Sequence, residues 1–263
     1  MTSNAEFEAI ANAIVEARKT SQCLDAFPGA PPPTLNDAYA VQDLAIAQHP
    51  SPIVGWKVAG VLGANAEKYG VDRLVGPVIE GTRWETGPNL SNISIIEGGH
   101  AAVEGEIVAI LNQDAPADKL DWSADEARAL IGSLHAGVEI AGSPYPRADV
   151  EPSTVTISNL GNNLGMIVGD ELPAWRDWAL EDWRCKSYVD DILVGENIPN
   201  RATGGPLESV RFLLENAARR GRPLEAGMAI CTGAITGVHD VKPGSRARIQ
   251  FAGADPITFN ISG

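Results

Sequence analysis

The spacing of apolar residues changes about 50 residues into the chain. Over residues 4–20, apolar side chains recur at intervals of three and four, which is the spacing of an amphipathic helix. A second helix is predicted to begin at Thr34, and it must end before Pro50 because the residue preceding a proline avoids helical backbone. We therefore expect a helical N-terminal part over residues 1–52 and a body of different character over residues 53–263.

The body alternates short apolar runs with Gly and Pro, a pattern typical of strands joined by turns. Helices are predicted from Ser123 to about His135 and from Pro206 to Gly221, and a hairpin is predicted around Asp190-Asp191. Strands are predicted at residues 53–58, 74–79, 103–111, 137–142 and 164–168, and again after residue 227. The pattern predicts an α+β protein with an antiparallel or mixed β body and helices at its edge.

Two acids lie one residue apart inside the apolar stretch around residues 103–111. Side chains at positions i and i+2 of a strand point to the same face, so Glu104 and Glu106 are expected to be neighbours. The glycine between them, Gly105, would permit a bend that brings their oxygens together around one hard divalent cation. The alternative is a strand with one solvated face that carries both acids.

Glu139 and Lys57 are the other charged residues that interrupt apolar strands. Three buried acids near one another would repel unless a cation neutralised them, so a divalent ion shared by Glu139 and the first pair is one interpretation. Lys57, between Trp56 and Val58, is either an outward lysine on a strand edge or a partly desolvated ammonium with a lowered pKa, able to move protons or hold a carboxylate.

Composition narrows the classes of partner. The 34 acids against 20 Lys and Arg give a net charge of −14, which disfavours nucleic acid and anionic membranes as partners. No signal peptide or membrane-spanning run is evident, so a cytoplasmic protein is expected. The three cysteines have no CxxC spacing, which argues against a disulfide framework or a zinc site made of thiolates. No nucleophile elbow, phosphate loop or dinucleotide motif occurs, so a nucleophilic hydrolase or a nucleotide-binding protein has no support. Of the four histidines, His100 lies four residues before Glu104 and could approach the acidic pair, and the alternative is a loop histidine with a structural role.

Several motifs together resemble the 2-keto-4-pentenoate hydratase family, which includes the related 2-oxo-3-hexenedioate decarboxylases and belongs to the fumarylacetoacetate hydrolase superfamily. The likeness extends from about residue 37 to residue 252. The motifs are Gly55-Trp-Lys-Val58, Glu104-Gly-Glu106, Gly137-Val-Glu139-Ile-Ala-Gly-Ser143, Gly204-Gly-Pro206 and Gly227-Met-Ala-Ile-Cys-Thr-Gly-Ala-Ile-Thr-Gly237.

The resemblance implies a mixed β-roll or sandwich of the fumarylacetoacetate hydrolase C-terminal type with a helical N-terminal part, and assembly into a homo-oligomer. It also implies a Mg²⁺ or Mn²⁺ ion held by the three acids, with a small 2-oxo or 2-hydroxydienoic acid as substrate. Carried onto this chain, the metal ligands are Glu104, Glu106 and Glu139, the catalytic residues are Lys57 and Asp72, and the substrate contacts are Thr232 and Gly233.

The resemblance also shows where the chain departs from the family pattern. Leu74 stands where many hydratases have an Asp that pairs with the lysine, and Asp72 is the nearest acid. Ala102 replaces an Arg or similar residue before the acidic pair, and Gly205 replaces a His before Pro206. We expect a hydratase acting on a 2-hydroxy-2,4-dienoate. The alternatives are a 2-oxo-3-hexenedioate-type decarboxylase, an acylpyruvate-type hydrolase that would need His100 and a nearby acid, and a non-catalytic oxo-acid-binding member.

Overall fold

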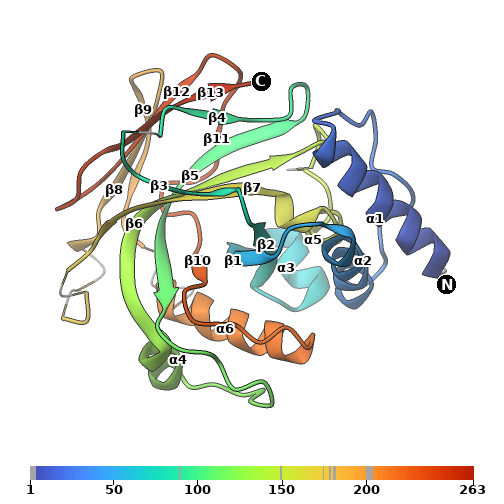
Figure 1. The fold of residues 1–263 in the computed structure, drawn as a ribbon, viewed down its shortest axis with the longest axis horizontal. Coiled ribbons are helices and arrows are strands. Elements are labelled where there is room, and N and C mark those ends of the chain that lie inside the picture. The colour runs from blue at the N-terminus through green and yellow to red at the C-terminus, as the bar shows by residue number, and fades with distance from the viewer. Residues whose placement is uncertain are drawn as a thin grey trace.

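Two sheets flanked by helices make up the protein, seen here in a computed structural model that describes residues 4–88, 90–148, 150–173, 175–177, 179, 182–199 and 204–263 (Figure 1). The helices are α1 (Asn4–Lys19), α2 (Leu35–Gln48), α3 (Gly63–Tyr69), α4 (Ala124–Leu130), α5 (Ser153–Ser158) and α6 (Gly205–Arg219), with a 3₁₀ turn η1 (Leu160–Asn162). None of the described helices is both long enough and apolar enough to cross a membrane.

The larger sheet has eight strands in the order β2-β1-β10-β5-β6-β7-β3, with β11 also paired to β5. Its members are β1 (Ile53–Gly60), β2 (Arg73–Ile79), β3 (Arg83–Glu85), β5 (His100–Leu111), β6 (Ile131–Ser143), β7 (Asn163–Glu171), β10 (Ala229–Cys231) and β11 (His239–Asp240). The β1–β10 and β3–β7 pairs are parallel and the other pairs are antiparallel, so the sheet is mixed, which is one of the two arrangements that the pattern predicted.

The smaller sheet has five strands in the order β4-β13-β12-β8-β9 and packs against the larger sheet at β5. Its strands are β4 (Asn92–Ser94), β8 (Cys185–Val189), β9 (Ile192–Asn197), β12 (Arg246–Phe251) and β13 (Ile257–Ser262). The predicted hairpin is confirmed, because β8 and β9 pair antiparallel across Asp190 and Asp191. Both turn residues have positive φ, 51° and 64°, as a two-residue hairpin turn requires.

Strand β5 separates the main core from the face that holds the acids. Val103 and Ile107 point into the main core, where the smaller sheet covers them. The alternate positions turn Glu104, Glu106 and Val108 to the opposite face. The alternation that predicted a strand therefore also decides which side chains can meet.

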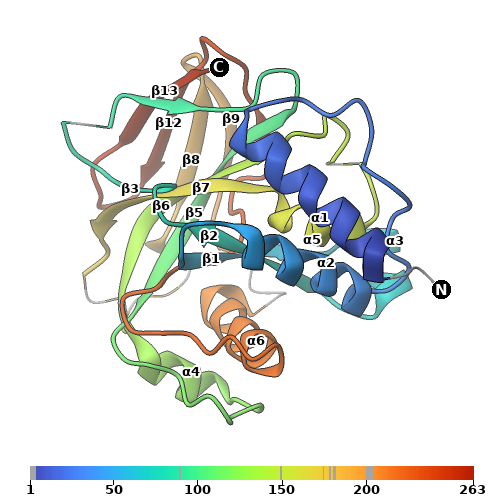
Figure 2. The same ribbon diagram turned by 45° about the vertical axis from the view of Figure 1, so that its right-hand side comes forward.

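Helices α1 and α2 lie side by side at one flank of the larger sheet, and α4 and α6 lie together at another edge (Figures 1 and 2). Phe7 and Ile10 of α1 and Val41 of α2 share the main core with Trp56 of β1. The N-terminal helices thus contribute to the same core as the β body, and a domain boundary at residue 52 stays a prediction.

One helix prediction is wrong in extent. Helix α4 ends at Leu130, not near His135, and β6 begins at Ile131. His135 lies within that strand, where its Nδ1 is 2.9 Å from the carbonyl oxygen of Gly169. Long-range pairing with β5 extends along β6 and overrides the local helical pattern.

Candidate functional site

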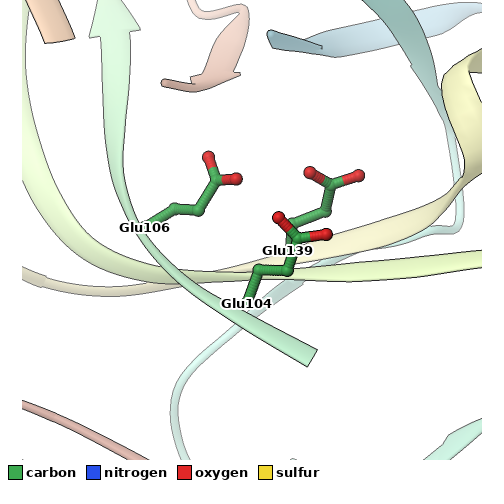
Figure 3. Close-up of side chains that lie close together, drawn as sticks. All are labelled: Glu104, Glu106 and Glu139. Carbon is green, nitrogen blue, oxygen red and sulfur yellow. The ribbon is translucent and has the colours of Figure 1, made fainter. Parts of the chain in front are cut away.

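Three carboxylates meet on one face of the larger sheet. Glu104 and Glu106 come from β5 and Glu139 from β6, and the strand register places Glu104 directly opposite Glu139. Figure 3 shows the three side chains on the same side of these strands. They are 6%, 0% and 0% exposed, and one oxygen of each lies within 4.8 Å of those of the others. The solvated-face alternative is therefore wrong for this strand.

The hydrogen bonds of the acids leave oxygens free to bind an ion. The backbone N–H of Gly233 donates to Glu106 Oε2 at 2.7 Å, and the Asn163 side-chain amide donates to Glu139 Oε1 at 3.0 Å. The other oxygens, Glu106 Oε1 and Glu139 Oε2, are buried and have no hydrogen-bond partner among the described residues. Buried acceptors without partners are costly, and an all-oxygen set fits a hard divalent cation. The residues therefore fit such an ion.

Burial and mutual repulsion oppose the charges on these acids. Burial, followed by the repulsion of Glu139, raises the pKa of Glu104 to about 8, although Lys57 acts in the opposite direction. Burial also raises the pKa of Glu106 well above its ordinary value, and repulsion from Glu139 and Glu104 adds to the effect. Without a cation the site therefore holds protons at neutral pH, and a cation must displace them to bind.

Lys57 faces the three acids and is not an outward edge lysine. Its side chain is 5% exposed, and its Nζ lies 3.2 Å from Glu139 Oε1. The expectation of a lowered pKa for Lys57 is wrong: burial opposes the charged ammonium, but attraction from Glu139, Glu104 and Glu106 outweighs it and the pKa is raised. Lys57 is therefore protonated at neutral pH and shares Glu139 Oε1 with the Asn163 amide.

A cavity of about 440 Å³ opens beside this cluster. Lys57, Glu104, Thr232 and Gly233 contribute to its wall. The Thr232 hydroxyl donates to the carbonyl oxygen of Ile107 at 2.8 Å, which anchors the first residue of the loop after β10 to strand β5. The cavity has room for a small organic acid next to the candidate metal centre.

Asp72 lies at the rim of the same cavity but away from Lys57. The register pairs Lys57 with Gly76, four residues beyond Asp72, which is about 13 Å along a strand. The Asp72 carboxylate is 61% exposed and binds the Arg73 guanidinium at 2.5 Å. The structure therefore does not bring Asp72 together with the lysine, and a catalytic role for it stays a prediction.

Two of the three positions that depart from the family pattern lie around the cavity. Leu74 lines it and packs with Val61 and Ile157, so an apolar group occupies the place of the acid. Gly205 starts α6 at the cavity wall, whereas Ala102 is fully buried. His100 lines the cavity too, but it makes no ion pair with a carboxylate in the part of the chain that the structure describes.

The sequence interpretation missed Asn163, which binds Glu139 directly, and the turn that precedes it. A signal was present, because Asn162 and Asn163 stand between Gly161 and Gly165. Asn and Gly are the residues that accept left-handed backbone, so this run marks a specific turn. Only the tertiary structure shows that the turn lies against the acids.

Sequence comparison relates the chain to hydratases. It is 28% identical over 156 residues to the TodF product hydratase of Pseudomonas putida. The aligned region covers 59% of this chain and 57% of that protein. It is 25% identical over 228 residues to 2-keto-4-pentenoate hydratase of Burkholderia vietnamiensis, which covers 84% of this chain and 85% of that protein. No family model matches. The match to the TodF product hydratase spans less than two thirds of that protein's length. The predicted resemblance to the hydratase family is confirmed at low sequence identity.

Comparison with solved structures identifies the fold. The 4-oxalocrotonate decarboxylase from Pseudomonas putida G7, complexed with magnesium and adipate, superimposes with a TM-score of 0.81 at 21% identity over 99% of both chains. A fumarylpyruvate hydrolase from Pseudomonas aeruginosa, in complex with Mn²⁺ and pyruvate, gives 0.57 at 16% identity over 82% of this chain and 92% of that chain. The predicted fold of the fumarylacetoacetate hydrolase superfamily is confirmed.

Proposed function

We propose that this protein is a metal-dependent hydro-lyase that adds water to a 2-hydroxy-2,4-dienoate, such as 2-hydroxypenta-2,4-dienoate, to give a 4-hydroxy-2-oxo acid. The observation that supports it is the set of three buried acids with two unpartnered oxygens, beside Lys57 and a cavity for a small acid. The curated relatives named as hydratases support the same reaction class. Such a reaction belongs to the breakdown of aromatic ring-cleavage products.

In this proposal Glu104, Glu106 and Glu139 hold Mg²⁺ or Mn²⁺, and the solved relatives described with magnesium or Mn²⁺ support a divalent ion. When bound, the ion supplies Lewis-acid polarisation of the C1 carboxylate and C2 oxygen of the substrate. The Gly233 N–H and the Asn163 amide keep two of the three carboxylates oriented toward it.

Lys57 and the cavity wall do the remaining work. The dienol first becomes its tautomer, a 2-oxo-3-enoate, by losing the proton of its C2 hydroxyl and gaining one at C5, and water then adds its hydroxyl to C4 and its proton to C3. Lys57 is the buried ammonium nearest the acids among the described residues, so we assign it the movement of these protons. Thr232 and Gly233 would contact the substrate beside the acids.

A decarboxylase acting on a 2-oxo-3-hexenedioate-type acid is the second candidate. The structural match to 4-oxalocrotonate decarboxylase over 99% of both chains favours it, as does Leu74 in place of the acid that pairs with the lysine in many hydratases. The same site would serve this reaction, because the enolate that forms on loss of CO₂ carries the same C1 carboxylate and C2 oxygen as the hydratase substrate. An acylpyruvate-type hydrolase has less support, because His100 has no described acid partner.

The test follows the loss of dienol absorbance with purified protein. We expect turnover with Mg²⁺ or Mn²⁺, no turnover with EDTA, and a loss of at least about 100-fold in Glu106→Gln, which removes one charged ligand. Glu97→Gln, a change of the same kind outside the cluster, is the control. Full activity in EDTA would contradict metal dependence. CO₂ release from 2-oxo-3-hexenedioate with no hydration would favour the decarboxylase.

Binding without turnover is distinguished by calorimetry with Mg²⁺ and oxalate. Binding of both, with no product from any substrate, would indicate a non-catalytic oxo-acid-binding protein. Homo-oligomer assembly and a cytoplasmic location stay predictions from the resemblance and the sequence, and sedimentation of the purified protein tests the first of them.

A further inference from the structure

The turn between α5 and β7 has an unusual backbone. Leu160, Gly161 and Asn162 are consecutive residues with φ of 54°, 69° and 54°. Left-handed backbone suits glycine and is tolerated by asparagine, but in leucine the Cβ crowds the following carbonyl oxygen. Such a conformation persists only where its surroundings hold it in place, and it is often found at functional sites.

Arg18, in the last turn of α1, holds this turn from outside the β body. Its Nη1 donates to the carbonyl oxygen of Asn163 at 2.7 Å. Its Nη2 donates to the carbonyl oxygens of Asn159 at 2.9 Å and Gly142 at 3.1 Å, and to Asn159 Oδ1 at 3.2 Å. One guanidinium therefore binds both ends of the turn and the end of β6.

The held turn contacts the candidate metal centre at two points. Asn163 donates its side-chain amide to Glu139 Oε1, which leaves Oε2 as the free ligand atom. Gly161 lies against Gly76 and the Lys57 side chain, since a Cβ at Gly161 would be 2.7 Å from Gly76 Cα and 3.2 Å from Lys57 Cε. The position of the turn thus determines both the orientation of Glu139 and the space available to Lys57.

We propose that Arg18 is a positioning residue, which acts through the turn Asn159–Asn163 to fix the Glu139 carboxylate and so sets the affinity of the site for a divalent cation. The inference rests on the proposed metal site. It assigns a role in that site to the N-terminal helix, which is 121 positions away from Glu139 in the chain (139 − 18). Partners that orient a ligand are worth about 10- to 100-fold in metal affinity.

The test measures the Kd for Mn²⁺ alone, from the electron paramagnetic resonance signal of the free ion, in wild type and Arg18→Met. We expect Arg18→Met to weaken Mn²⁺ binding by about 10-fold or more. Arg18→Lys keeps the charge but cannot reach all four acceptors, so its Kd should lie between the two. A Kd for Arg18→Met within twofold of wild type would overturn the proposal.

Two controls separate positioning from loss of stability. Lys19→Met changes the neighbouring residue, which is exposed and pairs only with Glu16 among the described residues, and should leave the Kd unchanged. Ile14→Ala removes buried core volume from the same helix and lowers the melting temperature, but it removes none of the hydrogen bonds that Arg18 donates to the turn. If Ile14→Ala weakens Mn²⁺ binding as much as Arg18→Met, the role of Arg18 is merely structural and the proposal is wrong.

Asn163→Ala provides the second variant should Arg18→Met fail to fold. It removes the link between the turn and Glu139, so it too should weaken Mn²⁺ binding about 10-fold, and a wild-type Kd would overturn the proposal. When Arg18→Met and Asn163→Ala are combined, the two losses of Mn²⁺ affinity should not add, because both act through the contact between Asn163 and Glu139. Wild-type protein that binds no Mn²⁺ would contradict the proposed function as well, whereas equal binding by wild type and Arg18→Met contradicts only this inference.

Discussion

Each acid of the candidate metal centre has its own environment, even though the three share one face. Glu106 is held by a backbone N–H, Glu139 by an amide and an ammonium, and Glu104 lines the cavity. The pattern leaves free oxygens where a cation would bind and puts the buried Lys57 ammonium beside Glu139. At the scale of single residues, the proposed metal ligands and the proposed proton-moving group are therefore adjacent but separable.

Lys57→Met tests that separation. We expect kcat to fall by about 10²- to 10⁴-fold, because a proton-moving group is lost. The Kd for Mn²⁺ should not weaken, since removal of a positive charge beside three carboxylates increases their attraction for a cation. Steady-state kinetics and an Mn²⁺ titration measure the two effects, with the surface variant Lys68→Met as the control. Parallel loss of metal binding would show that Lys57 mainly holds Glu139.

The candidate site depends on strands β5 and β6 of the larger sheet. The smaller sheet packs closely against this part of the larger sheet. Gly105 was expected to permit a bend between the two acids. In the structure it lies in regular pairing opposite Val138, and a Cβ on it would be 2.6 Å from Cys185 Sγ. The glycine is needed because β8 and β12 approach β5 closely at this point.

Gly105→Ala should therefore destabilise the packing of the two sheets. We expect a loss of about 1–3 kcal/mol in the free energy of unfolding, the usual cost of overpacking. The matched control is Gly60→Ala at the end of β1, where a Cβ would meet nothing within 4 Å. Urea unfolding of both variants compares them. Equal stability of Gly105→Ala and wild type would mean that the sheets separate easily there.

For the whole molecule, the buried acids link stability to pH and to the metal. The pKa of Glu104 is about 8 in the folded protein against an ordinary value of 4.5, so folding favours its protonated form. Its contribution to stability is complete below pH 4.5 and is lost as the pH rises through 8. The stabilisation that a bound cation provides should instead increase with pH, because its carboxylate ligands must be deprotonated.

The metal-free protein should consequently melt at a lower temperature at pH 8.5 than at pH 6, and Mg²⁺ should raise the melting temperature more at pH 8.5. At 100 times its Kd, the ion should add about 2.7 kcal/mol to the free energy of unfolding. Thermal unfolding in EDTA and in Mg²⁺ at the two pH values provides the measurement. Glu104→Gln, which cannot titrate, should show a smaller pH effect in EDTA. Higher stability of the metal-free wild type at pH 8.5 would contradict the assignment.

Some of this architecture follows from the sequence alone. The period of two along residues 103–111 determined that Glu104 and Glu106 share a face, because side-chain direction in a strand depends only on position. Spacing and caps determined the helices near 4–20 and 35–48, and the combination of motifs identified the superfamily fold. The short α3 could not be predicted in this way, since none of its residues is buried and it has no apolar stripe.

The tertiary structure alone decided which distant residues meet. Nothing in the spacing of Glu139, Lys57 and Asn163 places them together, because the register of β5 with β6 and the close approach of Gly161 to Gly76 depend on contacts across the whole chain. The same holds for Asp72, which is near Lys57 in sequence but is carried away from it by the antiparallel pairing of β1 and β2. Local periodicity determines the face on which a side chain lies. Long-range packing determines what it faces, and therefore that Arg18 of the first helix reaches the turn beside the candidate metal centre.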